Sequence, residues 1–154
     1  MSQIYTAITE KPIDILKAID SVKNPSFGAI DTFIGTVRNQ HDGKMVKGIT
    51  YDIHTSLAEQ FLKRLCYSAH SIWPETNYYV EHYKGELLVG GISIIIAVSA
   101  SHRVECFDAC RYVIEEIKKG APVWKKEHYE DGSRDWLPGY SLIEAETFKR
   151  NGDK

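Results

Sequence analysis

Apolar residues recur every three or four positions between residues 101 and 120, which is the period of an amphipathic helix. Ser101 is a suitable N-cap for this helix, and Gly120 followed by Ala121-Pro122 is a suitable end. The pattern therefore predicts a helix that buries one side. The residues on that side are Phe107, Cys110, Val113, Ile114 and Ile117.

The same analysis predicts the remaining elements of the chain. β-branched and aromatic residues favour strands over residues 3–9, 28–37, 48–54, 78–83, 86–89 and 91–99. A short helix opens at Pro12 and ends before Asn24-Pro25, and a second helix covers residues 57–69. Residues 38–47, with a turn at Asp42-Gly43, and residues 130–139 are expected to be loops, and residues 140–150 form an element of undetermined type.

Helices and strands are interspersed without strict alternation, which favours an α+β fold over a doubly wound sheet. The three strands between residues 78 and 99 are separated by glycines and predict antiparallel hairpins. We therefore expect one α+β domain over residues 1–154, with a mostly antiparallel sheet and packed helices.

Composition narrows the possible functions. The chain has 154 residues and a net charge of −2, so it has no general attraction to nucleic acid. Its start resembles no signal peptide, and its longest apolar run, residues 92–100, is too short to cross a membrane. Six histidines and three cysteines show no metal-ligand spacing. We expect a cytoplasmic protein without a metal or cofactor, which binds neither nucleic acid nor membrane.

Cationic residues gather at both ends of the predicted helix over residues 101–120. His102 and Arg103 lie at its start, where backbone N–H groups also favour an anion. At its end, the pairs Lys118-Lys119 and Lys125-Lys126 lie on either side of an APVW segment. A further cation, Arg38, follows the strand predicted at residues 28–37. Each also has an ordinary interpretation: a capping histidine, a solvated arginine, or lysines that oppose the helix dipole.

A lysine used as a nucleophile, acid or base needs a lowered pKa. The helix C-terminus favours the charged amine by ~0.3–1 kcal/mol, whereas complete burial can lower a lysine pKa by up to ~3–5 units. A closed pocket would therefore lower the pKa, and an open one would leave the lysines as anion ligands.

The helix also sets a distance. His102 and Lys118 are sixteen residues apart, which along a continuous helix corresponds to ~24 Å. One small ligand cannot touch both residues of one chain. Either two separate sites exist, or a symmetric dimer brings His102 and Arg103 of one chain beside Lys118 and Lys125 of the other. We favour the shared site as a hypothesis.

Five segments of the chain are specific in combination. They are GAIDTFIGTVR at 28–38, DGKMVKGITYDIH at 42–54, VSASHR at 98–103, KKGAPVWKKE at 118–127 and DGSRDW at 131–136. In this order and spacing they resemble the large, catalytic subunit of molybdopterin synthase. The core match covers residues 28–136 and leaves 137–154 as a tail of undetermined order. The sequence departs from the family pattern at some positions, such as Asp135 before Trp136, but none of these is one of the candidate lysine, arginine or histidine residues.

The resemblance implies an α+β, hammerhead-like subunit that forms a homodimer. It also implies a small ubiquitin-like sulfur-carrier subunit at each end, giving a heterotetramer. The enzyme would be a sulfurtransferase of molybdenum cofactor biosynthesis that converts cyclic pyranopterin monophosphate to molybdopterin. The sulfur would come from the C-terminal thiocarboxylate of the carrier. No metal is implied, because molybdenum enters later.

The family's functional positions can be carried over residue by residue. The catalytic lysines correspond to Lys118 and Lys125. The substrate-binding positions correspond to Thr36, Val37, Arg38, His102, Arg103, Lys118, Lys125, Lys126 and Glu127. Glu127 has a second interpretation, because it could simply pair with a neighbouring lysine.

Two other functions compete with this interpretation. A non-catalytic docking module for a ubiquitin-like partner would need neither Lys118 nor Lys125. A hydrolase or acyltransferase for a phosphorylated small molecule would act without a thiocarboxylated partner.

Overall fold

The computed structural model describes residues 3–137, which contain two sheets and the helices that pack on them. The elements follow the order β1 (Ile4–Thr9), α1 (Ile15–Val22), β2 (Ala29–Thr36), β3 (Gln40–His41), β4 (Lys44–Ile53), α2 (Thr55–Ile72), β5 (Thr76–Tyr83), β6 (Gly85–Leu88), β7 (Ile92–Ala100), α3 (Arg103–Gly120), β8 (Val123–Tyr129) and β9 (Arg134–Leu137). The predicted α+β class is confirmed. The element expected at residues 140–150 lies outside the described residues.

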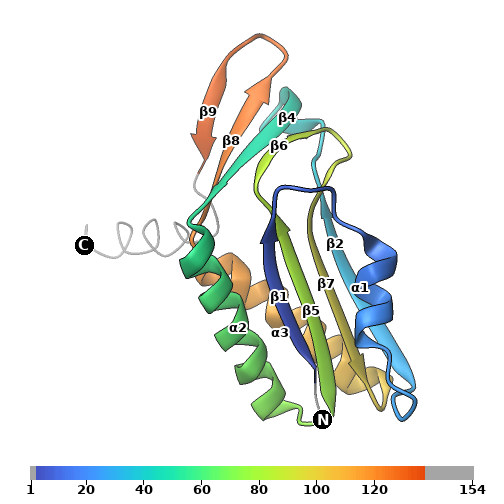
Figure 1. Cartoon of the computed structure of the whole chain (residues 1–154). Helices are drawn as coiled ribbons and strands as arrows, with labels where there is room; N and C mark the ends of the chain where they lie inside the picture. The colour runs from blue at the N-terminus through green and yellow to red at the C-terminus, as the bar shows by residue number, and fades with distance from the viewer. Residues whose placement is uncertain (1–2, 138–154) are drawn as a thin grey trace, which may run out of the picture.

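The first sheet has the order β1-β5-β7-β2 and is covered on both faces. Successive residues of a strand point to opposite faces. Tyr78 and Val80 accordingly pack with α2 and α3, whereas Tyr79 packs with Ala18 and Val22 of α1. Figure 1 shows α1 on one face and α2 and α3 on the other. Only the β1–β5 pair is parallel in this sheet.

The second sheet has the order β3-β4-β8-β9, with β6 on the free part of β4, and all of its pairs are antiparallel. Most of it projects beyond one end of the first sheet (Figure 1). The turn at Asp42-Gly43 is confirmed, because both residues have positive φ and join β3 to β4 as a tight hairpin. The expected loop over residues 38–47 is therefore largely a hairpin.

Three other predictions about strands need correction. The hairpins predicted between residues 78 and 99 are wrong for β6, which pairs with β4 in the second sheet while β5 and β7 pair directly. The loop predicted at 130–139 contains β9, which pairs with β8. β8 itself was not predicted, because the charged residues Lys125, Lys126 and Glu127 interrupt the pattern of apolar residues that indicates a strand.

Helix α3 ends at Gly120 as predicted, and most of its expected apolar stripe is buried. Two details differ. His102 is the N-cap in place of Ser101, whose hydroxyl instead donates to Glu75 Oε2 at 3.0 Å. Phe107 is 58% exposed, and Cys106 and Ala109 face the core instead. No helix within residues 3–137 is long and apolar enough to span a membrane.

Gly48 lets β4 and β6 approach closely, which makes it sensitive to substitution. A Cβ at this position would lie 2.5 Å from the backbone oxygen of Leu87. We expect Gly48→Ala to lower the free energy of unfolding by ~1–3 kcal/mol, because the β6 backbone must shift. Urea denaturation measures this change, with exposed Lys47→Ala as the control. Equal midpoints for the two variants would contradict the close approach.

Candidate active site

A cavity of about 440 Å³ lies where the two sheets meet the C-terminal end of α3, and we call it the lysine cavity. The first sheet contributes the end of β2 and the start of β7, and the second sheet contributes β4 and β8. The polar residues that line it are Thr36, Arg38, Gln40, Tyr51, Ser93, Lys118, Lys125 and Glu127.

Three cations from distant parts of the chain converge on this cavity. Arg38 follows β2, Lys118 lies in the last turn of α3, and Lys125 lies on β8. Burial lowers the pKa of Lys125, Lys118 and Arg38 lower it further, and the carboxylate of Glu127 opposes them. A lowered pKa of Lys125 is what the sequence analysis expects of a lysine in a closed pocket. Its neutral amine is available at a lower pH than that of an ordinary lysine.

The strand geometry of β8 separates two neighbouring lysines. Lys125 and Glu127 are two residues apart, face the same side of the strand and line the cavity. Lys126 faces the other side, where its ammonium lies 5.2 Å from the centre of the Trp136 ring. The structure thus brings Lys125 and Glu127 into the site and places Lys126 outside the cavity.

Glu127 is a buried carboxylate in the cavity wall. Its Oε2 has no hydrogen-bond partner among the described residues, and its Oε1 lies 3.6 Å from Nδ1 of His41. Burial raises the pKa of Tyr129 to about 12, and a hydrogen bond with Glu127 adds to this. Burial likewise raises the pKa of Tyr51, on the cavity wall. Both tyrosines therefore remain protonated near neutral pH.

Thr36 and Val37 differ in how they relate to the cavity. Thr36 lines it, whereas the side chain of Val37 is buried in the core. The backbone of Val37 donates to the carbonyl of Gly91 at 3.0 Å and accepts from the N–H of Gly90 at 2.8 Å. These two bonds fix the chain immediately before Arg38.

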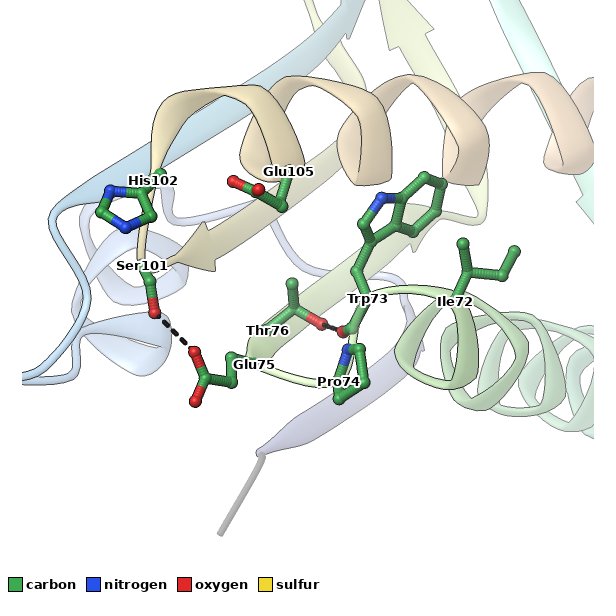
Figure 2. A pocket seen from close by; sticks show the side chains of 8 residues that line it. All are labelled: Ile72, Trp73, Pro74, Glu75, Thr76, Ser101, His102 and Glu105. Atoms are coloured by element: carbon green, nitrogen blue, oxygen red, sulfur yellow. Dashed lines mark hydrogen bonds between the residues drawn. The ribbon is translucent and has the colours of Figure 1, made fainter.

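His102 and Arg103 lie at the opposite end of α3 from Lys118. His102 lines a different cavity, of about 350 Å³, between α3 and the end of α2. Figure 2 shows His102 above Ser101, with Glu105 on the first turn of the helix and Trp73 and Glu75 across the cavity. Because α3 is continuous, the ~24 Å separation from Lys118 holds within one chain.

Several residues of the lysine cavity were not predicted from the sequence. Gln40, Tyr51 and Ser93 reach it through strand pairing, and no local motif marks them. His41 was not predicted either, although it adjoins the Asp42-Gly43 turn and contacts Glu127. Within residues 3–137 no group of three or more His, Cys, Asp or Glu side chains could hold a metal ion.

Comparisons with known proteins identify the family. The family model described as MoaE protein matches residues 8–120. The molybdopterin synthase catalytic subunit of Synechococcus elongatus is 42% identical over 134 residues, which cover 86% of this chain and 81% of the relative. The chain belongs to the MoaE family of molybdopterin synthase catalytic subunits. The resemblance found in the sequence is thereby confirmed, together with the assignment to an enzyme of molybdenum cofactor biosynthesis.

Other MoaE relatives agree in sequence and in fold. The catalytic subunit of Halalkalibacterium halodurans is 44% identical over 126 residues, covering 82% of this chain and 81% of the relative. The crystal structure of molybdopterin synthase from Staphylococcus aureus superimposes with a TM-score of 0.83 at 32% identity, covering 86% of this chain and 96% of that one. A complex of subunits 1 and 2 of molybdopterin-converting factor from Helicobacter pylori shares the fold, with a TM-score of 0.70 at 23% identity, covering 86% of this chain and 89% of that one.

The lowered pKa of Lys125 predicts its chemical reactivity. A small acylating reagent modifies only neutral amines, so the midpoint of Lys125 modification should lie below that of an ordinary lysine. Glu127→Gln should move this midpoint to still lower pH, because it removes the carboxylate that stabilises the ammonium. Mass spectrometry after timed acetylation at several pH values measures the midpoint.

A matched variant controls for a general loss of charge in this experiment. Glu116 pairs with Lys119 at 3.2 Å on the surface of α3, so Glu116→Gln should leave the Lys125 midpoint in place. A shift of equal size in both variants would contradict the local effect of Glu127.

Proposed function

We propose that the lysine cavity is the sulfur-transfer site of this subunit. The sulfur donor is the C-terminal thiocarboxylate of a small ubiquitin-like carrier, and the acceptor is cyclic pyranopterin monophosphate. The observation that carries the proposal is the convergence of Arg38, Lys118 and Lys125 on one cavity that also contains the buried Glu127. The name shared by the relatives and the subunit complex of the same fold support this choice of reaction and partner.

The carrier's tail ends in a negatively charged thiocarboxylate, which suits a cavity with three cationic side chains. Lys118 lies at the exposed end of α3 and stabilises the charge that develops at the carrier's acyl group. Lys125, whose pKa is lowered by burial, assists it by exchanging a proton.

The reaction has two bond-forming stages for each sulfur. The thiocarboxylate sulfur first bonds to a carbon of the pterin substrate as a C–O bond at that carbon breaks and its oxygen leaves with the electron pair, so that the carrier stays attached through a thioester. Water then attacks the acyl carbon and the acyl C–S bond breaks. The carrier leaves as a carboxylate, while the sulfur remains on the product. In this proposal the carboxylate of Glu127, which lies in the cavity wall, accepts the proton of this water.

Substrate binding in this proposal uses both ends of α3 and therefore two subunits. Arg38 and Thr36 of one chain contact the pterin, and Val37 fixes the backbone that presents Arg38. His102 and Arg103 of the second chain bind the cyclic phosphate at the start of their helix. Lys126, on the outer face of β8, contributes positive charge from outside the cavity. The assembly is a homodimer with one carrier at each end.

Reconstitution tests this function directly. Purified subunit is mixed with thiocarboxylated carrier and cyclic pyranopterin monophosphate, and the dithiolene product is assayed. We expect product only when both components are present, with the carboxylate form of the carrier as the inactive control. A stable complex without product would indicate a docking module, and turnover without the carrier would indicate a different enzyme.

A further inference from the structure

His41 lies between two carboxylates that differ greatly in exposure. Its Nδ1 is 3.6 Å from Oε1 of Glu127, whose side chain is 4% exposed, and its Nε2 is 3.1 Å from Oδ2 of Asp42, whose side chain is 89% exposed. The imidazole is itself 27% exposed. It therefore links a buried carboxylate of the lysine cavity to one at the surface.

The hairpin that carries His41 fixes the position of the imidazole. β3 has only two residues, and the turn after it uses positive φ at Asp42 and at Gly43. His41 pairs with Lys44 across the hairpin, but the ammonium of Lys44 lies over the Tyr129 ring at 4.8 Å and 3.9 Å from Asp135. The imidazole is thus the group that faces Glu127 from this hairpin.

A buried carboxylate is stable only when its charge is compensated. The two ring nitrogens of His41 face different carboxylates, Nδ1 that of Glu127 and Nε2 that of Asp42. The contact engages Oε1 of Glu127, whereas Oε2 is shielded from solvent. Its effect is to fix the orientation of the Glu127 carboxylate.

We propose that His41 is a positioning residue for the reaction, which holds Oε1 of Glu127 and so orients this carboxylate for the water that releases the carrier. This inference rests on the proposed function and adds a residue outside the lining of the lysine cavity. In the step it supports, an O–H bond of water breaks and a bond forms between that proton and the Glu127 carboxylate. The water oxygen bonds to the acyl carbon as the acyl C–S bond breaks.

Two substitutions at this position separate orientation from packing. His41→Leu keeps an apolar volume and removes the donor, so we expect kcat to fall by ~10–100-fold while the KM for the pterin changes less than about twofold. His41→Asn places an amide N–H near the position of Nδ1 and should restore most of kcat. Equal losses in both variants, at equal melting temperatures, would overturn the proposal.

A double-mutant cycle tests whether His41 acts through Glu127. In the Glu127→Gln background, the further change His41→Leu should lower kcat by less than about twofold, because the group that His41 orients is already altered. Multiplicative losses would show that His41 acts independently of Glu127 and would overturn the proposal.

A measurement that does not depend on enzyme activity tests the contact between His41 and Glu127 separately from the proposed reaction. In protein labelled with ¹⁵N-histidine, Glu127→Gln should shift the imidazole ¹⁵N resonances of His41 and leave those of His54, at the start of α2, in place. Unchanged His41 resonances would overturn the contact. An inactive wild-type reconstitution with shifted His41 resonances would refute the sulfur-transfer function alone.

Discussion

Replacing Lys118 by alanine is expected to lower the rate of sulfur transfer by about 10²–10³-fold, the usual cost of removing one group that stabilises transition-state charge. Lys118 is the only lysine that α3 contributes to the lining of the lysine cavity. Binding of the pterin should change little, because Arg38 and the His102-Arg103 pair are left intact. Single-turnover sulfur transfer and equilibrium binding of the substrate measure the two effects separately.

The neighbouring lysine provides a matched control for this experiment. Lys119 carries the same charge in the same helical turn, but it is 62% exposed and pairs with Glu116 at 3.2 Å. Lys119→Ala should therefore stay within about twofold of wild type, since exposed pairs contribute little. Equal losses in both variants would indicate a general effect of charge at the helix end. Unchanged turnover in Lys118→Ala would refute the catalytic assignment.

Local patterns were sufficient to predict much of the fold. The stripe of α3 and its end at Gly120 follow from helical periodicity and from a glycine and proline that stop a helix. The turn at Asp42-Gly43 follows from the two residues that best tolerate positive φ. Each of these features depends on residues that are close together in the sequence.

The features that the sequence did not predict depend on long-range pairing. β6 lies between β5 and β7 in the sequence but pairs with residues 48–51 of β4. No local sequence pattern indicates this pairing. β8 carries Lys125 and Glu127 on a face that lines a polar cavity, and Lys126 on the other face, so charged residues interrupt the apolar pattern expected of a strand. Functional requirements override the expected alternation at the site itself.

In the candidate site, too, some residues were found from local patterns and others depend on long-range pairing. Arg38, Lys118 and Lys125 were found as residue types beside strand and helix ends, and the structure brings all three to one cavity. The contact between His41 and Glu127 joins residues 86 positions apart, across strands β3 and β8 that both flank β4. Only the order of strands in the second sheet places them together.

Hybrid dimers should show whether one site is built from two chains. If His102 and Arg103 act in the partner's site, a dimer of one His102→Ala chain and one Lys118→Ala chain contains one site with both substitutions and one with neither. Two different affinity tags allow these hybrids to be purified away from the parental dimers. We expect them to recover about half of the wild-type activity, whereas each parental dimer stays inactive.

The reciprocal hybrid makes the test decisive. A chain with both His102→Ala and Lys118→Ala, paired with a wild-type chain, places one substitution in each shared site and should be inactive. Sites contained within one chain predict the opposite pair of results, with the reciprocal hybrid half active and the first hybrid inactive. The two arrangements distribute the substitutions over the sites in opposite ways, so the outcomes are mutually exclusive. The ~24 Å that α3 sets between His102 and Lys118 favours the shared site, because no small substrate can reach both residues of one chain.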